Sequence, residues 1–487
     1  MRVVLALLVG FPLGAAPAGF RVRLGSDVVS LGVEEYVAAV VAGEGSVFRS
    51  EEALKAMAVA ARSYAVRLRG RHASEGFDFC ITTHCQHLDR RAVTPRRASI
   101  AGQTGGELLW FEGKPAFACY TRNCGGRTEA VAAVWPDLAE PYLQSHADDY
   151  CLRSGTADWQ WTTTSQDLVS ALRRSGLRSP PVIEQIAVTE ITASGRARIL
   201  TLLGGGEPVR ISAGSLRFAV GRALGWNTLR SDRYQVGAGF VFQGSGAGHG
   251  VGLCQNGADQ MGLDGRSYRE ILDFYYPGTV VGTTARGFAW RRISGESIAL
   301  LTTRPDQDRA VLGLAERLLR GVTQRTNLPP PENVEIRVYP DLDAFRNATS
   351  EPGWVAAHTT GHRIHLQPPA VLRKRGALEQ VLRHELLHVV VETRARPGLP
   401  VWFREGLVGF LDTPGHTGRS GAAGSGDGGI QQTQHAGQAR DAYREATRAV
   451  TALVERYGED TVRSWLRLGL PAEVRKTGGR QAPTESR

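Results

Sequence analysis

Hydrophobic residues recur at helical spacing in two stretches near the start of the chain. Residues 33–43 and 51–68 both place apolar side chains three or four positions apart, which predicts two helices. Ser50, with two acidic residues directly behind it, is a suitable N-terminal cap for the second helix. Apolar residues also occupy the opposite face of this helix, so we expect it to be buried on both sides and Arg62 to be a buried cation that needs a partner.

The pattern changes several times along the rest of the chain. Residues 20–31 alternate as strands do, and short strand-like runs with Gly-rich turns dominate residues 110–279. A polar break at 291–296 is followed by a β-then-α pattern. Because 487 residues are too many for one ordinary hydrophobic core, we expect an α+β protein with two domains, at 19–290 and 295–470.

Two stretches near the C-terminus lack a regular pattern. Residues 413–440, rich in Gly, Ser, Gln and His, predict a mobile loop, and residues 471–487 predict a disordered tail. Residues 443–468, between them, read as helical.

The first residues indicate export. Arg2 precedes an apolar run, and Ala16-Pro17-Ala18 offers the small residues that a signal peptidase reads. This pattern predicts a signal peptide at 1–18 and a secreted, periplasmic or cell-envelope protein; the alternative is a first buried strand. No other segment approaches the roughly 20 apolar residues of a membrane span, so no transmembrane segment is expected.

Charge narrows the choice of partner only slightly. The formal net charge of +10 suits an anionic partner, such as nucleic acid, an acidic membrane surface or an acidic cell-wall polymer. An Arg-rich solvated surface explains the same charge equally well. No Lys/Arg block with interleaved aromatic residues is present, and no nucleic-acid partner is therefore expected.

The six cysteines fall into two groups. Cys80 and Cys85, with His72 and His84, supply four soft or borderline ligands of the kind that tetrahedral zinc prefers. The alternative is a disulfide between Cys80 and Cys85 with bystander histidines, since disulfides persist outside the cytoplasm. The remaining four are scattered along the chain and are candidates for disulfide bonds; they are Cys119, Cys124, Cys151 and Cys254.

Two further features of the first domain could carry chemistry. Glu44 follows one apolar helix and faces the next, and desolvation there would raise its pKa and let it act as a general acid, although a Glu at a helix end is more often a surface residue. Residues 248–258 contain a glycine pattern without the strand, helix and acidic residue of a dinucleotide loop, so close backbone approach to a polymer is the better interpretation.

Taken in order, five motifs of the first domain resemble the stage II sporulation protein D (SpoIID) family, which includes amidase enhancers. They lie at residues 44–64, 77–86, 119–135, 141–143 and 248–279. The resemblance implies a peptidoglycan lytic transglycosylase that cuts glycan strands stripped of stem peptides, or an enhancer of a peptidoglycan amidase. It also implies that Glu44 is the catalytic acid/base and that the His-Cys cluster holds structural zinc.

Candidate glycan-binding residues and two departures from the family pattern follow from the same motifs. The candidate residues are Arg62, Tyr64, His249 and Gln255. Residues 45–48 read Gly-Ser-Val-Phe where the family usually has a Met-Pro pair, which affects the expected substrate preference. Cys119 and Cys124 replace residues that are commonly not Cys, which suggests a local disulfide.

The second domain carries a separate metal signature. Residues 377–392 read as a helix, on which His384 and His388 share one face and can reach one zinc ion. Glu385 lies next to them and can activate a bound water. A second short helix, beginning near Trp402, presents Glu405 as the third protein ligand of a catalytic site with an open position.

This region resembles the gluzincin metallopeptidases, in particular the peptidase MA-like group. The resemblance implies a zincin-like α+β domain with a catalytic Zn2+ and a peptide or protein substrate. We expect the strand near 361–366 to form the edge that binds an extended peptide. His416 and His435 in the predicted loop could close the site and give a latent form.

Two functions of different classes remain open. The first is a cell-wall enzyme that cuts peptidoglycan glycan and a peptide. The second is a cell-wall binding protein that stimulates an amidase, with a degenerate metallopeptidase scaffold. The presence of Glu44 together with the complete metal signature favours the enzyme.

Overall fold

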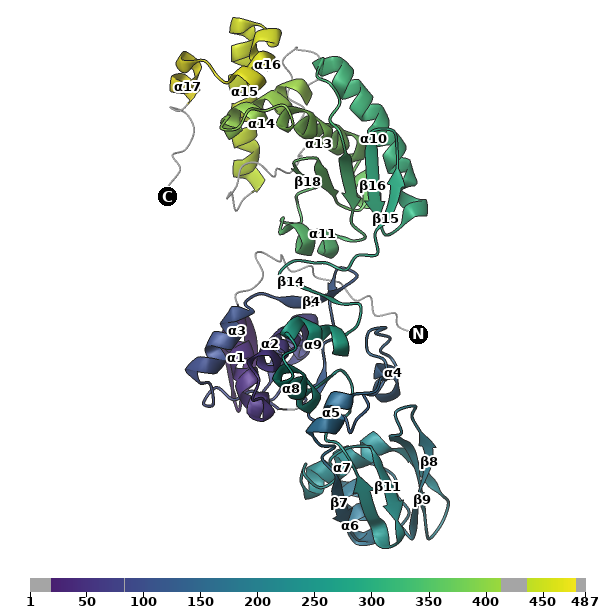
Figure 1. Cartoon of the computed structure of the whole chain (residues 1–487). Helices are drawn as coiled ribbons and strands as arrows, with labels where there is room; N and C mark the ends of the chain where they lie inside the picture. Colours follow the sequence, from purple (N-terminus) through teal and green to yellow (C-terminus); the bar gives the residue numbers. More distant parts are fainter. Residues whose placement is uncertain (1–18, 83, 413–435, 479–487) are drawn as a thin grey trace. The chain divides into compact units, whose positions relative to one another are not determined.

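The computed structural model describes residues 19–82, 84–412 and 436–478. It separates into two compact units, Met1–Gly287 and Phe288–Arg487, each described by itself below (Figure 1). The predicted signal peptide lies outside the described residues, as do residues 413–435 of the predicted loop. Within the part of the chain that is described, no helix is long and apolar enough to cross a membrane.

The first unit opens with a hairpin and two buried helices. Strands β1 (Gly19–Leu24) and β2 (Asp27–Gly32) pair antiparallel, and β3 (Phe79–Cys80) adds to β1 in parallel. Helices α1 (Val33–Glu44) and α2 (Glu51–Arg67) confirm the helical pattern. The Ser50 hydroxyl accepts a hydrogen bond from the Ala53 N–H at 3.4 Å, as expected for an N-terminal cap.

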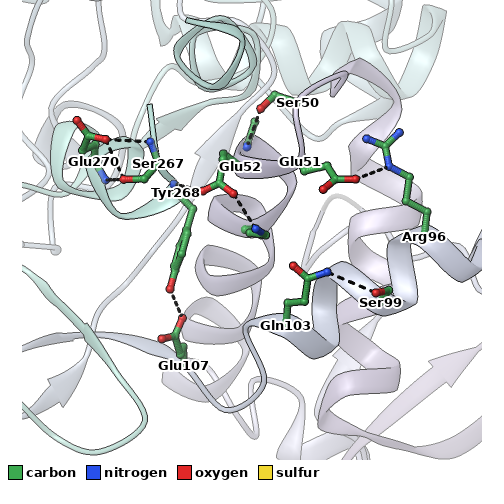
Figure 2. A network of polar contacts seen from close by, with 12 residues as sticks. Ser50, Glu51, Glu52, Arg96, Ser99, Gln103, Glu107, Ser267, Tyr268 and Glu270 are labelled. Atoms are coloured by element: carbon green, nitrogen blue, oxygen red, sulfur yellow. Dashed lines mark hydrogen bonds and ion pairs between the residues drawn. The ribbon is translucent and has the colours of Figure 1, made fainter. Parts of the chain in front are cut away.

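Helix α2 forms the centre of this unit. It packs against α1, α3 (Pro95–Gln103), α8 (Gln255–Leu263) and α9 (Tyr268–Tyr275), which surround it in Figure 1. Polar contacts at the start of α9 tie it to α2: the Tyr268 N–H donates to Glu52 Oε2 at 2.8 Å, and its hydroxyl bonds Glu107 Oε2 at 3.0 Å (Figure 2). Residues more than 200 positions apart in sequence therefore share one core.

Two small sheets lie beside these helices. One is a three-stranded sheet in the order β14-β4-β5, and the other is the parallel pair β13-β6. Their bounds are β4 (Leu108–Phe111), β5 (Lys114–Pro115), β6 (Tyr120–Thr121), β13 (Leu253–Cys254) and β14 (Val280–Gly282). The pairing of β6 with β13 and the antiparallel bridge between Asn123 and Ala247 bring two motifs of the sequence together.

A lobe inserted between β6 and β13 has a hydrophobic core of its own. Its two three-stranded sheets have the orders β10-β9-β8 and β11-β12-β7. The strands are β7 (Trp159–Thr162), β8 (Gln185–Ile191), β9 (Ala197–Leu203), β10 (Val209–Ser212), β11 (Tyr234–Gly237) and β12 (Val241–Gly244), and the helices are α6 (Ser165–Arg174) and α7 (Ala213–Leu224).

The prediction that strands dominate residues 110–279 was wrong in part. Helices α6, α7, α8 and α9 lie in this region, and each has 8 to 12 residues. Their hydrophobic faces are too short to stand out among the surrounding glycines. Side-chain caps start these helices, including the Ser267–Glu270 capping box of α9 visible in Figure 2.

The second unit is built on a five-stranded mixed sheet in the order β15-β16-β17-β19-β18. Its strands are β15 (Arg291–Ser294), β16 (Ile298–Thr302), β17 (Val334–Val338), β18 (Ala357–Thr360) and β19 (Arg363–Leu366). The predicted polar break at 291–296 is largely the edge strand β15, whose side chains are mostly exposed. An edge strand needs few apolar residues, which explains why the sequence pattern concealed it.

Helices complete the second unit. Helix α10 (Pro305–Thr326) connects the parallel strands β16 and β17 and packs against α13 (Leu378–Glu392), which in turn packs against α14 (Val401–Asp412). The predicted helix at 443–468 is two helices, α15 (Ala436–Tyr457) and α16 (Glu459–Leu468), because Gly458 between them adopts φ +82°.

Both C-terminal predictions of irregular structure extended too far. Helix α15 starts at Ala436, inside the stretch predicted as a loop. Helix α17 (Ala472–Gly478) lies inside the predicted disordered tail, and residues 479–487 are outside the described residues. Val474 explains the second difference, because its buried side chain joins the core of the second unit.

Candidate functional site

Glu44 is the last residue of α1, where the chain turns through the short helix η1 (Gly45–Val47) toward α2. Its carboxyl is partly buried and accepts hydrogen bonds on both oxygens. The His87 N–H donates to Oε1 at 3.1 Å, and the Gln255 side-chain amide donates to Oε2 at 3.4 Å. The carboxyl is thus fixed by two segments distant from it in sequence.

Burial raises the pKa of Glu44 above its ordinary value. The hydrogen bonds from His87 and Gln255, with the nearby charge of Arg122, oppose this effect without cancelling it. A carboxyl with a raised pKa keeps its proton to higher pH, as a general acid at neutral pH requires.

Of the four predicted glycan-binding residues, Gln255 is the one that donates a hydrogen bond to Glu44. Only 1% of its surface is exposed, and its Oε1 has no hydrogen-bond partner among the described residues. It begins α8, directly after the paired strand β13, so backbone structure fixes its place beside Glu44.

The prediction that Arg62 binds substrate does not fit the structure. Its side chain is 1% exposed and pairs with Glu34, with Nε bonded to Oε1 at 3.0 Å and Nη2 to Oε2 at 2.5 Å. The same guanidinium donates to the carbonyl oxygens of Ala101 and Glu107. With its donors used in this way, Arg62 joins α2 to α1 and to the end of α3.

Tyr64 and His249 also lie mostly inside the fold. Tyr64 is buried with its hydroxyl bonded to Arg71, so it contributes to packing rather than to glycan contact. His249 Nδ1 accepts the Val251 N–H at 3.0 Å, and the ring packs edge-on against Trp135. Burial lowers the pKa of His249 to about 3, so its imidazole is neutral at physiological pH.

Sequence reasoning missed two residues at this site. His87 holds Glu44 through its backbone N–H, which no side-chain pattern can reveal. Arg122 lies near enough to affect the pKa of Glu44, and it donates to the Ser46 hydroxyl at 3.0 Å. A single Arg after a short strand is not by itself a sign of a functional residue. Its place between Cys119 and Cys124, in one of the five family motifs, could have suggested a role.

The predicted zinc ligands His72, Cys80, His84 and Cys85 converge: their ligand atoms all lie within 4.8 Å of one another. The two sulfurs are 3.5 Å apart and both cysteines are free, which rules against the alternative of a Cys80–Cys85 disulfide. Cys85 Sγ lies 3.4 Å from His72 Nε2. His84 Nδ1 lies 3.8 Å from Cys80 Sγ and 3.7 Å from Cys85 Sγ.

These separations are those of a tetrahedral ligand set. Zinc bond lengths to sulfur and nitrogen give edges of about 3.8 Å between two sulfurs and about 3.6 Å between sulfur and nitrogen. In addition, Glu75 Oε1 lies 2.5 Å from His72 Nδ1, the position from which a carboxylate commonly orients a metal-binding imidazole. The four residues therefore fit a structural zinc ion.

The other cysteines do not pair as predicted. Cys119 and Cys124 are both free, and the structure shows no disulfide among the described residues. Cys124, Cys151 and Cys254 instead lie together with Asp148, whereas Cys119 is not part of this group.

In the second unit, helix α13 places His384 and His388 one turn apart with their Nε2 atoms 3.2 Å from each other. Two nitrogens on one tetrahedral zinc ion would be about 3.4 Å apart. Glu405 on α14 completes the group, with its Oε2 3.6 Å from His388 Nε2. The buried Oε2 of Glu405 accepts no hydrogen bond from the described residues, which fits a carboxylate that binds a cation. Glu392, which pairs with Arg404, also has its ligand atom within 4.8 Å of those of His388 and Glu405. His384, His388 and Glu405 therefore fit a zinc ion, with the Glu392 carboxylate beside them.

Glu385 lies on the same helix beside this group. Its Oε2 accepts a hydrogen bond from the Thr359 hydroxyl of β18 at 2.5 Å. In the order of the sheet, the edge opposite β15 is β18 and not β19, so the edge predicted at 361–366 was assigned to the wrong strand of this hairpin. His416 and His435 lie outside the described residues.

Asp412, the last residue of α14, is a functional candidate that sequence reasoning missed. Its Oδ2 lies 3.2 Å from His384 Nδ1, and its Oδ1 accepts from Arg383 Nε at 2.8 Å. A carboxylate in this position fixes the imidazole with Nε2 toward the metal. Its spacing of seven residues from Glu405, on the same face of one helix, could have suggested it.

Comparison with known proteins supports part of these assignments. Residues 25–110 match the sequence model of the family described as Stage II sporulation protein, and residues 334–396 match the one described as eCIS core domain. The resemblance of the N-terminal part to the SpoIID family is thereby confirmed. The second match names no peptidase, and the gluzincin resemblance stays a prediction.

The chain is also similar to characterised and uncharacterised proteins. It is 29% identical to an uncharacterized protein of Brachyspira hyodysenteriae over 52% of this chain and 67% of that protein. It is 26% identical to the stage II sporulation protein D of Bacillus subtilis, over 55% of this chain and 80% of the relative. Identity to the amidase enhancer of the same organism is 25%, over 48% of this chain and 38% of the relative.

Proposed function

We propose that the first unit is a cell-wall enzyme that cleaves peptidoglycan glycan strands as a lytic transglycosylase, with Glu44 as acid and base. The observation that supports it best is the Glu44 carboxyl, which has a raised pKa and hydrogen bonds on both oxygens. Glu44 also lies in the segment that matches the family. A net charge of +10 suits the acidic polymers of the cell envelope, where we place the protein.

The proposed reaction needs one proton-transfer group. Protonated Glu44 gives its proton to the glycosidic oxygen as the bond from that oxygen to C1 of the muramyl residue breaks. The C6 hydroxyl of the same residue then attacks C1 and returns a proton to the Glu44 carboxylate. The product carries a 1,6-anhydromuramyl end, and no water is consumed.

Mass spectrometry of digested peptidoglycan tests this proposal. Purified protein should release fragments with 1,6-anhydromuramyl ends, and it should do so faster from glycan without stem peptides. Ordinary reducing ends would indicate hydrolysis with a second carboxylate and would contradict the proposed reaction.

An amidase enhancer is the second candidate function. The similarity to the amidase enhancer of Bacillus subtilis favours it. An enhancer would release no glycan fragments by itself but would raise the rate at which an added cell-wall amidase frees stem peptides. The same digests, with and without the amidase, distinguish the two functions.

For the second unit we propose a zinc-dependent peptidase. His384, His388 and Glu405 would hold the metal, which when bound lowers the pKa of a water and polarises the substrate carbonyl. Glu385 would take the proton from that water and pass it to the leaving amine. An extended peptide would pair with the free side of the edge strand β18, whose Thr359 already contacts Glu385.

A further inference from the structure

A second group of potential metal ligands lies in the first unit, made of residues different from the His72 cluster. Cys124, Asp148, Cys151 and Cys254 bring their ligand atoms within 4.8 Å of one another, and all four residues are buried. None of the four has any exposed surface. Such a concentration of ionisable groups inside a core needs a physical explanation.

Regular structure positions each of these side chains. Cys124 follows β6, and Cys254 ends β13, the strand parallel to β6. Asp148 caps the short helix α5 (Asp149–Ser154) by accepting the Cys151 N–H at 2.8 Å. Helices α5 and α8 pack against each other, which brings the four side chains together from three separate segments.

Most polar contacts around the group suit anionic ligands, although Cys151 Sγ also lies 3.3 Å from the acceptor Asn123 Oδ1. Cys254 Sγ accepts the N–H groups of Cys124 at 3.3 Å and Gly257 at 3.4 Å. The Tyr275 hydroxyl donates to Asp148 Oδ2 at 2.9 Å. Such N–H and O–H donors stabilise a thiolate or a carboxylate, and they are the outer contacts that metal ligands commonly have.

The distance between two of the side chains and the space beside them also fit a bound zinc ion. Cys124 Sγ lies 3.2 Å from Asp148 Oδ2, slightly less than the edge of about 3.6 Å between sulfur and oxygen on a zinc ion. At Gly257, an added Cβ would lie 2.6 Å from Asp148 Oδ2 and 2.2 Å from the Tyr275 oxygen. The absence of a side chain there lets α8 approach the carboxylate.

A buried cation compensates part of the charge. Arg196 is 2% exposed, its Nη2 donates to the Cys124 carbonyl at 2.7 Å, and it interacts electrostatically with the Cys124 thiol. Two other nitrogens of this guanidinium have no hydrogen-bond partner among the described residues. One guanidinium cannot neutralise three thiolates and a carboxylate, whereas a divalent cation bound by all four would neutralise half of their charge and Arg196 would offset part of the remainder.

We propose that Cys124, Asp148, Cys151 and Cys254 hold a structural zinc ion. Three thiolates select a thiophilic metal, and four buried protein ligands leave no open position for a substrate, so the site is structural. A disulfide is the competing arrangement. It would use two of the three thiols and leave the third thiol and the Asp148 carboxyl buried without a metal ion.

The position of this zinc site gives it a role beside Glu44. Cys254 directly precedes Gln255, and Cys124 lies two residues after Arg122. The His72 cluster has the same relation to Glu44 from the other side, since Cys85 lies two residues before His87. The two metal sites would then hold in place the segments that surround the Glu44 carboxyl.

Metal content of the full-length protein tests the proposal without any activity assay. Inductively coupled plasma mass spectrometry should find one zinc ion per chain less in Cys151→Ser than in the wild type. Cys119→Ser is the matched control, because Cys119 is also a buried free cysteine but lies outside the group, and its zinc content should not change. Equal zinc content in Cys151→Ser and the wild type would overturn the proposal.

A second measurement uses the wild type and so does not depend on the folding of a variant. Protein purified without reductant is denatured in a chelator and an alkylating agent, and its peptides are analysed by mass spectrometry. The zinc site predicts that Cys124, Cys151 and Cys254 are all alkylated. A cross-linked peptide that joins any two of them would show a disulfide and overturn the proposal.

Cobalt substitution distinguishes the Cys124 group from the Cys80 and Cys85 pair. In Cys80→Ser/Cys85→Ser protein, added Co2+ should still give the intense thiolate-to-cobalt absorption of a tetrahedral site, because the Cys124 group remains. Loss of this absorption in folded protein would contradict the assignment.

Discussion

The side-chain amide of Gln255 donates to Glu44 Oε2 at 3.4 Å, joining the start of α8 to the end of α1. The other carboxyl oxygen accepts the His87 N–H at 3.1 Å. A carboxyl held on both oxygens loses little further freedom when it transfers a proton. This arrangement explains how a residue at a helix end, normally mobile and solvated, can act as a positioned acid.

Replacing Glu44 by Gln should abolish glycan cleavage and leave the fold intact. Gln keeps the size of the side chain and can still accept the His87 N–H, but it cannot transfer a proton. We expect a loss of roughly 10²–10⁴-fold in the rate of glycan release, with binding to the polymer unchanged. Glu35→Gln is the control, since Glu35 lies on the same helix but is exposed and pairs only with Arg90 among the described residues.

Release of anhydromuramyl products should be measured for both variants beside polymer pull-down. Cleavage by Glu44→Gln at the wild-type rate would show that another group is the acid. An equal loss in Glu35→Gln would indicate damage to α1 rather than lost proton transfer.

The same substitution has a consequence for stability that depends on pH. Because burial raises the pKa of Glu44 in the folded state, ionising it opposes folding above the pKa it has in the unfolded chain. Glu44→Gln should therefore raise the melting temperature at pH 7 to 8, and the difference should vanish at about pH 3, well below the ordinary pKa of 4.5, where both states are protonated. Differential scanning calorimetry across this range checks the sign, and a variant that is less stable at pH 7 contradicts it.

Removing the donor that Gln255 provides should shift the pH profile. The hydrogen bond from Gln255 lowers the pKa of Glu44, so Gln255→Leu should raise that pKa further and extend the alkaline limb of the cleavage profile to higher pH. The maximal rate should fall because the carboxyl is held by one donor only. A fall in rate without any shift of the profile would mean that Gln255 has only a packing role.

The sequence predicted the parts of the site that depend on local pattern. The helices that end in Glu44 and begin at Ser50 follow from apolar spacing and a capping residue. The pair His384 and His388 follows from the turn of one helix. These relations span a few residues, so they are present in the sequence whatever the rest of the fold does.

Relations between distant segments could not be predicted in this way. The role of Arg62 depends on Glu34 and on two carbonyl groups that only the packing of α1 and α3 brings near. The grouping of Cys124, Cys151 and Cys254 depends on the pairing of β6 with β13. A cysteine pattern alone does not specify connectivity, which is why these residues suggested disulfides.

Arg62 should therefore affect stability rather than glycan binding. Arg62→Met keeps most of the side-chain volume but removes an ion pair and the guanidinium donors to the Ala101 and Glu107 carbonyl groups, of which Ala101 keeps the Thr104 hydroxyl as a donor. We expect a loss of about 2–5 kcal/mol in the free energy of unfolding. Urea unfolding measures this loss, and Arg96→Met, which removes an exposed ion pair with Glu51, should cost less than about 1 kcal/mol (Figure 2). Weaker glycan binding at unchanged stability would restore the substrate-binding role.

The metal site proposed for the second unit predicts different losses for residues in different positions. Glu385→Gln removes the proposed base without touching a ligand, so it should keep zinc and lose peptidase activity. Glu405→Ala removes a ligand and should lower zinc affinity strongly. Asp412→Asn leaves all three ligands but weakens the contact on His384 Nδ1, for which we expect a loss of roughly 10–100-fold in affinity.

Zinc titrations with a competing chelator and cleavage of casein measure these effects separately. Cys80→Ser/Cys85→Ser/Cys151→Ser protein is the right background, because it removes thiolate ligands from both cysteine groups of the first unit while the second unit keeps its own ligands. Glu379→Gln serves as the control, since Glu379 lies in the first turn of α13 and is outside the metal group. Zinc binding that is unchanged in Glu405→Ala would remove Glu405 from the ligand set. A wild-type protein that binds zinc at His384 and His388 but cleaves no peptide would assign this unit a binding rather than a catalytic role.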